Sequence, residues 1–264
     1  MIVFNNQPIG IFDSGVGGLS ITKYIKQQLP HEQLIYVADT LHSPYGDKPP
    51  HSIIKIVNTV AEKLLQQKIK ALVVACNTAT VNTIELLRTQ ITIPIIGVEP
   101  AIKPATIHSK NKKVGVLVTQ ATANNPRFLS LIDKFSNGAE VIIQPCPGLV
   151  ELIEQGDINA LKCETLLNNY LIPLISEGVD TIVLGCTHYP FLLEKIKATC
   201  GDNIKIIDTA VPVTNELQRQ LQNNQICAAV NNPSRIEFFS SKPSLLLDRL
   251  CTNLLDQEVS FKLF

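Results

Sequence analysis

The chain has 264 residues, 45% of them hydrophobic and 17% charged, which is enough apolar material for a substantial core and excludes a disordered chain. Its 23 basic and 23 acidic residues cancel, and no block of lysine and arginine stands out, so neither nucleic acid nor an anionic membrane is expected as a partner. No apolar run is as long as a membrane-spanning helix, and the first residues lack the charged leader of a signal peptide.

Apolar, strand-like runs alternate with helix-like segments as far as residue 207. Strands are expected at residues 8–12, 33–38, 71–75, 94–98, 113–118, 140–144, 180–184 and 204–207. Helices are expected at residues 18–29, 51–68, 78–90, 124–136, 149–155, 158–177 and 190–200. This alternation predicts an α/β fold, with helices on both faces of a parallel sheet. Ligands of such folds bind beyond the carboxyl ends of the strands.

Two cysteines stand directly after predicted strands, Cys76 in VVACNTAT and Cys186 in VLGCTHYP. A cysteine that only fills the core would lie inside the strand and not at its tip. Cys76 is expected at the start of a helix capped by Asn77 or Thr78, where the positive helix end lowers a thiol pKa. His188 follows Cys186 by two residues, and a nearby histidine is the usual way to obtain a thiolate near neutral pH.

Simpler interpretations of these residues remain open at this point. Cys186 could be a core residue and His188 a cap of the next helix, and an i, i+2 Cys/His pair is poor spacing for zinc. Glu154, on a short predicted helix, could be an ordinary surface residue. With no CxxC pair, the chain is expected to hold free thiols in the cytosol. We interpret five cysteines as packing residues: Cys146, Cys163, Cys200, Cys227 and Cys251.

The stretch GIFDSGVGGLS also has two interpretations. Its glycines resemble a dinucleotide fingerprint, but the third glycine would fall at Ser20, and no Walker A lysine follows. The turn is either a tight connection in which Ser14 caps the next helix, or a backbone site for a carboxylate at the helix N-terminus. In the second case Asp13, at the strand tip, could act as a base or assist a thiol.

A weak internal repeat links these motifs. IGIFDSG and VGVLVTQAT (114–122) are both strand-to-turn units, and each is followed about 60 residues later by a strand that ends in a cysteine. Two similar halves that face each other would bring both thiols to one cleft. A regulatory disulfide would not explain the polar companions, and a cysteine hydrolase needs only one thiol. Acid/base chemistry on one carbon, with a thiolate on one face and a thiol on the other, uses both cysteines.

At these residues the sequence resembles the glutamate racemases of the cofactor-independent aspartate/glutamate racemase superfamily. The matching segments are IGIFDSGVGGLS (9–20), VADTLHSPYGDKP (37–49), VVACNTAT (73–80), PIIGVEPAIKPA (94–105), VGVLVTQAT (114–122), CPGLVELIEQG (146–156), LGCTHYPFL (184–192) and IIDTA (206–210). The resemblance implies two similar parallel-sheet α/β domains with the active site in the cleft between them. One domain would comprise residues 1–98 with 210–264, and the other residues 99–209.

By resemblance, Cys76 removes the α-proton of D-glutamate with help from Asp13, and Cys186 removes that of L-glutamate with help from Glu154 and His188. Further residues that match the family's substrate-binding positions are Ser14, Pro44, Tyr45, Gly46, Asn77, Thr78, Thr119, Thr122 and Thr187. The resemblance implies no metal and no pyridoxal phosphate. It also implies a homodimer in the bacterial cytosol that supplies D-glutamate for peptidoglycan.

Two departures from the family's sequence pattern and two alternative functions bear on this interpretation. Val118 stands where many members have glycine, and LHS (41–43) stands where basic or small residues are common. An aspartate racemase of the same superfamily usually has glutamate in place of His188, so GCTH favours glutamate. A two-lobed binding protein would keep the glycine-rich turns but has no need of two thiols at strand tips.

Overall fold

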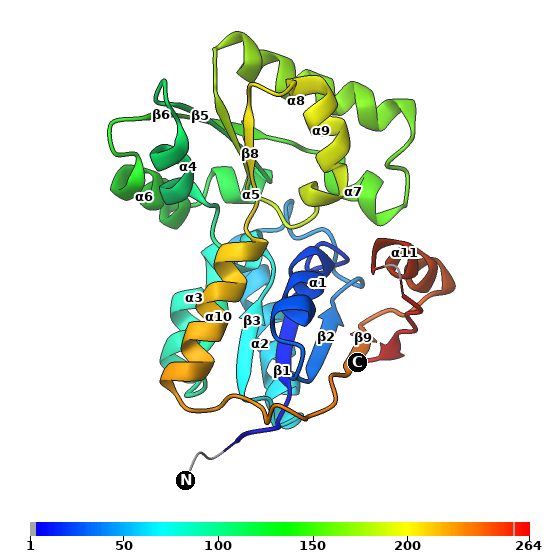
Figure 1. Ribbon diagram of the computed structural model, residues 1–264. Coiled ribbons are helices and arrows are strands. Elements are labelled where there is room, and N and C mark those ends of the chain that lie inside the picture. Colours follow the sequence, from blue (N-terminus) through cyan, green and yellow to red (C-terminus); the bar gives the residue numbers. More distant parts are fainter. Residues whose placement is uncertain (1–3, 256) are drawn as a thin grey trace. The chain divides into compact units, whose positions relative to one another are not determined.

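The computed structural model describes residues 4–255 and 257–264 (Figure 1). The chain divides into two compact units, Met1–Val98 with Ala210–Phe264, and Glu99–Thr209. Each unit contains one sheet in which every paired strand is parallel to its neighbour. The predicted fold class, two parallel-sheet α/β domains, is confirmed.

The first unit contains a six-stranded sheet in the order β10-β9-β2-β1-β3-β4. Its strands are β1 (Ile9–Asp13), β2 (Leu34–Ala38), β3 (Ala71–Val74), β4 (Ile95–Gly97), β9 (Ile236–Ser240) and β10 (Lys262–Leu263). Every residue of β1, β2 and β3 is buried. Strands that are covered on both faces are apolar along their whole length, which is why these three were visible in the sequence.

The helices of this unit are α1 (Leu19–Gln28), α2 (Pro50–Gln66), α3 (Asn77–Gln90), α10 (Ala210–Asn223) and α11 (Leu245–Leu255). Alternate strand residues such as Phe12 and Val74 share a buried cluster with Ile53, Val57 and Leu64 of α2. Because side chains alternate between the faces of a strand, the intervening residues point to the opposite face of the sheet. Helix α1 packs against α10 and α11. Figure 1 shows α1 and α10 at the front of this unit.

The second unit contains a four-stranded sheet in the order β6-β5-β7-β8. Its strands are β5 (Lys113–Val118), β6 (Glu140–Pro145), β7 (Thr181–Leu184) and β8 (Lys205–Ile207). Its helices are α4 (Ile102–His108), α5 (Gln120–Ala123), α6 (Pro126–Phe135), α7 (Leu149–Glu154), α8 (Leu161–Ser176), the 3₁₀ turn η1 (Tyr189–Leu192) and α9 (Leu193–Cys200). Across the described residues, every helix is too short or too polar to span a lipid bilayer.

The two sheets share one strand order. In the first, β2-β1-β3-β4 are neighbours, and in the second β6-β5-β7-β8 repeat this arrangement in the same chain order. The strand before Cys76 (β3) lies beside β1, and the strand before Cys186 (β7) lies beside β5. The two cysteines therefore occupy equivalent positions in their own units. The first sheet differs by its extension through β9 and β10 beyond β2.

The structure adds elements that the sequence analysis did not predict. Helix α4 contains Pro104 and α5 is a single turn, so both lack the long apolar spacing from which a helix is recognised. The helix expected at 190–200 begins instead as η1 and continues as α9. After residue 207 the sequence analysis named no elements, and this part of the chain forms α10, β9, α11 and β10.

A buried ion pair joins distant segments of the first unit. Lys70 Nζ lies 2.5 Å from Glu32 Oε2, with side chains only 1% and 6% exposed. The same ammonium donates to the carbonyl oxygen of Asn5 at 2.6 Å, and Glu32 Oε1 accepts the backbone N–H of Ala228 at 2.9 Å. Both charges are thus paired and hydrogen-bonded, and they hold the segment that leads from α10 to β9.

We expect Lys70→Met to lower the free energy of unfolding by about 3–5 kcal/mol, because it leaves the buried Glu32 carboxylate without its counter-charge. Urea unfolding followed by circular dichroism measures this change. The matched control is Lys197→Met, which breaks an exposed pair with Glu194 and should change stability by less than about 0.5 kcal/mol. Equal losses in the two variants would contradict the prediction.

Candidate active site

The first thiol, Cys76, lies between β3 and α3 in the first unit. Its side chain is 5% exposed, and its Sγ lies 3.6 Å from the hydroxyl of Ser14. Cys76 occupies the N-cap position of α3, so Asn77 and Thr78 lie inside the helix, and the expectation that one of them caps it was wrong. The unpaired N–H groups at the start of this helix favour negative charge at the thiol.

Asp13 and the glycine-rich turn form the neighbouring strand tip. The fully buried Asp13 accepts the backbone N–H of Gly15 on Oδ1 at 2.7 Å. A Cβ at Gly18 would lie 2.8 Å from Asp13 Cβ and 3.1 Å from Ala75 Cβ, so the absence of a side chain lets α1 begin in contact with both strand tips. Gly18 itself precedes α1, so Ser14 does not cap this helix, contrary to one of the two interpretations.

Asn77 presents an unsatisfied acceptor beside the first thiol. Its Nδ2 donates to the carbonyl oxygen of Val98 at 3.0 Å. Within the described part of the chain, its buried Oδ1 has no hydrogen-bond partner. A buried amide oxygen without a donor is costly, so this atom suits a ligand that carries an N–H group, such as an ammonium.

The loop after β2 contains two functional candidates that sequence reasoning missed, Asp39 and His42. Tyr45, a predicted binding residue in this loop, is buried and donates its hydroxyl to Asp39 Oδ2 at 2.6 Å. Burial and then the charge of Asp39 raise the pKa of Tyr45 well above its usual range, so the phenol remains a donor. The predicted binding residues Pro44 and Gly46 flank Tyr45 and are half-buried.

In the second unit, three side chains contact one another in a row: the second thiol, Cys186, then His188 and then Glu154. The Sγ of Cys186 lies 3.7 Å from His188 Nδ1, and His188 Nε2 lies 2.6 Å from Glu154 Oε1. Cys186 and His188 are buried, and Glu154 is 17% exposed. Both ring nitrogens face these partners, so the ring does not serve as a helix cap. A Cβ at Gly185 would lie 2.8 Å from the carbonyl oxygen of Leu117, which explains the glycine before the thiol.

The charge of His188 follows from this arrangement. Burial alone lowers the pKa of His188, but hydrogen bonds to Cys186 and Glu154, together with their charges, raise the pKa well above its usual range. The imidazole therefore carries its proton at neutral pH. A raised folded-state pKa stabilises the folded protein below the unfolded pKa, and this contribution is lost as the pH rises through the folded-state value.

Three predicted threonines lie at the same edge of the second sheet. Thr119, which follows β5, caps α5 by accepting the N–H of Thr122 at 3.3 Å, and its hydroxyl donates to that of Thr122 at 3.0 Å. Thr187 stands between Cys186 and His188 and is buried. The structure thus brings hydroxyl groups to the edge where Cys186 lies.

Two further buried residues, Cys146 and Tyr189, lie near Cys186, and the sequence analysis did not connect them with this thiol. The backbone N–H of Cys146 and the hydroxyl of Tyr189 both donate to the carbonyl oxygen of Val118, at 2.9 and 3.2 Å. Burial, and then the charge of Cys186, raise the pKa of Cys146 well above its usual range, so this thiol stays neutral. Contacts across strands of this kind leave no signal in a linear sequence.

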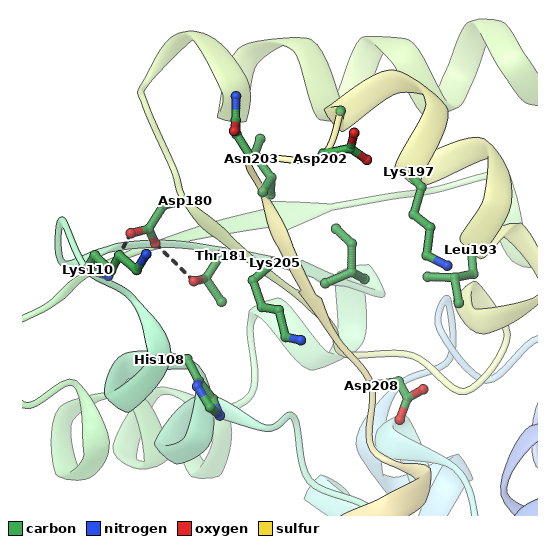
Figure 2. Close-up of a pocket in the computed structure, with 13 residues that line it drawn as sticks. His108, Lys110, Asp180, Thr181, Leu193, Lys197, Asp202, Asn203, Lys205 and Asp208 are labelled. Carbon is green, nitrogen blue, oxygen red and sulfur yellow. Dashed lines mark hydrogen bonds between the residues drawn. The ribbon is translucent and has the colours of Figure 1, made fainter.

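The second unit also has a pocket of about 540 Å³ along the open edge of β8, shown in Figure 2. Its lining residues all differ from those predicted for the site. Three lysines (Lys110, Lys197 and Lys205) are balanced by three aspartates (Asp180, Asp202 and Asp208). Asp180 already accepts the backbone N–H groups of Lys110 and Asn111 at 2.7 and 2.9 Å. Nor do the described residues include a cluster of three or more His, Cys, Asp or Glu that could hold a metal ion.

The fold and the two sites define a two-unit α/β protein with a buried thiol at an equivalent strand tip in each unit. Residues 9–217 match the family model described as Asp/Glu/Hydantoin racemase. This match spans well over half of the chain, and the chain therefore belongs to that racemase family.

Individual relatives agree with this assignment. A glutamate racemase from Ralstonia nicotianae is 44% identical over 252 residues, which cover 95% of this chain and 90% of that protein. The solved structure of glutamate racemase isoform RacE1 from Bacillus anthracis matches with a TM-score of 0.91 at 32% identity, over 98% of both chains. The glutamate racemase from Francisella tularensis, solved in complex with D-glutamate, matches with a TM-score of 0.85 at 30% identity, over 98% of this chain and 97% of that one. The predicted resemblance to glutamate racemases is confirmed.

We expect Glu154→Gln to lower the pKa of His188, because it removes the carboxylate charge while keeping a side chain of the same length. NMR titration of protein with labelled histidine measures the midpoint for His188. The control is Glu151→Gln on the same helix, α7, which should leave that midpoint in place. An unchanged midpoint in Glu154→Gln would show that the Nε2–carboxylate contact does not hold the proton.

Proposed function

We propose that this protein is a glutamate racemase that interconverts L- and D-glutamate without a cofactor, using two thiols as acid and base. The proposal rests on one observation. Each sheet has a buried cysteine at the same strand tip, and each of these cysteines lies beside groups that stabilise a thiolate. The names of the relatives, and the D-glutamate bound by the Francisella tularensis protein, support glutamate as the substrate.

Racemisation needs a proton to leave one face of the α-carbon and another to arrive on the opposite face. In the proposed reaction the Cys76 thiolate takes the α-proton of D-glutamate, and the Cys186 thiol then donates a proton to the other face, which gives L-glutamate. The reverse reaction starts from the Cys186 thiolate. Each turnover converts one thiolate to a thiol and the other thiol to a thiolate, so the proton count balances.

The neighbours of each thiol have distinct proposed roles. Asp13 assists Cys76, and Ser14 supplies a hydroxyl beside its sulfur. On the other side, the protonated imidazole of His188 stabilises the Cys186 thiolate, and Glu154 holds that imidazole in place. A cation is needed there because glutamate is itself an anion, and like charges oppose the formation of a thiolate.

Substrate binding is proposed to use the polar groups at the two sheet edges. We propose that the units, with bounds as described, act as two domains that face each other across a cleft and enclose glutamate between the thiols. The unsatisfied Oδ1 of Asn77 would accept the substrate ammonium group. The remaining proposed binding residues are Ser14, Pro44, Tyr45, Gly46, Thr78, Thr119, Thr122 and Thr187.

The rival functions make different demands on these residues. In aspartate racemases of the superfamily a glutamate usually replaces His188, so the imidazole between Cys186 and Glu154 favours glutamate as the substrate. A protein that only binds a ligand would not react selectively with iodoacetamide at the two strand-tip thiols. A cysteine hydrolase would need only one thiol with a base.

The proposed cellular role is the supply of D-glutamate for peptidoglycan by a homodimer in the bacterial cytosol. All seven cysteines are free, as a reducing compartment keeps them. Because the two enantiomers have equal free energy, conversion of L-glutamate beyond an equal mixture depends on a later step that consumes D-glutamate. Light scattering of the purified protein measures its oligomeric state.

We expect Cys76→Ala and Cys186→Ala each to lower kcat/KM for racemisation by at least about 10²–10⁴-fold in both directions, because each turnover needs one acid and one base. Chiral chromatography of glutamate measures both directions. In deuterated water, Cys76→Ala should keep more α-proton exchange with L-glutamate than with D-glutamate, and Cys186→Ala the reverse.

The matched control for this pair is Cys163→Ala, a buried cysteine on α8 that is expected to affect stability and not turnover. Near-normal racemisation by either strand-tip variant would overturn the two-thiol mechanism. Equal exchange of both enantiomers in both variants would overturn the assignment of each thiol to one enantiomer.

We also expect turnover to survive dialysis against EDTA and treatment with hydroxylamine, since the two thiols, and neither a metal nor a pyridoxal aldehyde, move the proton. Chiral chromatography before and after each treatment measures this. Activity that is lost on dialysis and restored by zinc or pyridoxal phosphate would contradict the mechanism.

A further inference from the structure

We infer that His42 is a positioning residue for substrate binding: its imidazole holds the buried Asp39 carboxylate, which in turn holds the hydroxyl of Tyr45 in the loop that binds glutamate. The inference rests on the proposed function and adds a residue to which neither the sequence motifs nor the family resemblance gives a role. It also concerns one of the positions, 41–43, at which this chain departs from the family.

The side chains of His42, Asp39 and Tyr45 contact one another in that order. His42 Nδ1 lies 2.9 Å from both carboxylate oxygens of Asp39, and Tyr45 donates its hydroxyl to Oδ2 of the same carboxylate at 2.6 Å. The backbone N–H of His42 donates to the carbonyl oxygen of Asp39 at 3.2 Å, so a tight turn aims the ring at the carboxylate. Tyr45 therefore depends on Asp39 for its hydrogen bond, and Asp39 in turn contacts the imidazole of His42.

The side chains of Asp39 and His42 differ strongly in how much of each is exposed to solvent. The Asp39 side chain is 2% exposed, whereas the His42 side chain is 43% exposed. A buried carboxylate is costly without hydrogen-bond partners, and the imidazole of His42 supplies one.

The Asp39 carboxylate that His42 contacts lies near the edge of the first sheet. Asp39 donates its backbone N–H to the carbonyl oxygen of Asp13 at 2.9 Å, so the carboxylate stands beside the edge of the sheet where the first thiol lies. The phenol of Tyr45 lies within the electrostatic range of Asp13, Asp39 and Cys76. The titratable or charged groups on the segments around His42 are Asp13, Asp39, Tyr45, Asp47, Lys48, Cys76 and Lys242.

The beginning of the loop is attached by groups that do not titrate. The backbone N–H of Leu41 donates to the hydroxyl of Ser241 at 2.9 Å, and the hydroxyls of Thr40 and Ser240 lie 2.6 Å apart. These contacts fasten the start of the loop to the segment at the end of β9. The end that carries Pro44, Tyr45 and Gly46 is attached through Asp39, so loss of the His42 imidazole loosens the binding part and leaves the start in place.

The experiment compares KM and kcat for D-glutamate between variants and the unmodified protein. For His42→Asn, KM should rise about 3–10-fold, as expected for the loss of one hydrogen bond that holds Asp39, while kcat stays near its normal value.

The variant His42→Arg keeps a long side chain that can donate to the Asp39 carboxylate, so its KM should stay near that of the unmodified protein. His51→Asn is the matched control, an exposed histidine on α2 whose substitution should leave KM unchanged. If His42→Asn fails to fold, as shown by circular dichroism, His42→Gln provides the same comparison.

The outcomes separate this inference from the function on which it rests. Normal turnover with an unchanged KM in His42→Asn, or an equal rise of KM in His42→Asn and His42→Arg, would overturn the role of His42 alone. A merely structural histidine would change the amount of folded protein and leave KM unchanged. Absence of glutamate turnover in the unmodified protein would overturn the proposed function and this inference with it.

Discussion

Parallel pairing of β1 with β3, and of β5 with β7, determines where the chemically important side chains lie. Parallel strands end at a common edge, so Asp13 at the end of β1 and Cys76 beyond β3 lie at one edge of the first sheet, and Thr119 and Cys186 lie at the corresponding edge of the second. Small residues allow this meeting, because a side chain at Gly18 or Gly185 would collide with the neighbouring strand tip. Both sites are thus built from the ends of strands that the core holds rigidly.

The two thiols are supported by different physical means. Cys76 stands at the start of a helix of 14 residues, whose unpaired N–H groups favour an anion there. Cys186 is followed by a 3₁₀ turn of only four residues and is supported by an imidazole that a carboxylate keeps charged. A helix end does not titrate, whereas an imidazole does, so the proposed mechanism implies that high pH changes kcat and KM differently in the two directions, while the two kcat/KM values fall by the same factor because the enantiomers have equal free energy.

The sequence predicted the central strands and the thiol positions because both depend on local patterns. Buried parallel strands are continuous apolar runs, and a cysteine at the end of such a run is visible without a structure. The contact between His42, Asp39 and Tyr45 was not predicted, because it depends on the path of a loop and not on periodicity. The pairing of β9 with β2 joins segments about 200 residues apart, and the sequence of neither strand indicates which strand it pairs with. The catalytic and binding roles of the named residues stay predictions.

The pairing of β2 with β9 also sets an order of events during synthesis. Strand β2 emerges from the ribosome early, but β9, which pairs with it, follows the whole unit formed by Glu99–Thr209. The nascent chain therefore carries a fully apolar strand with one unpaired side while the second unit is completed, and such an edge readily pairs with another chain. Any change that slows synthesis between residues 210 and 240 prolongs the exposure of β2, so the yield of folded protein depends on a stretch of chain far from either thiol.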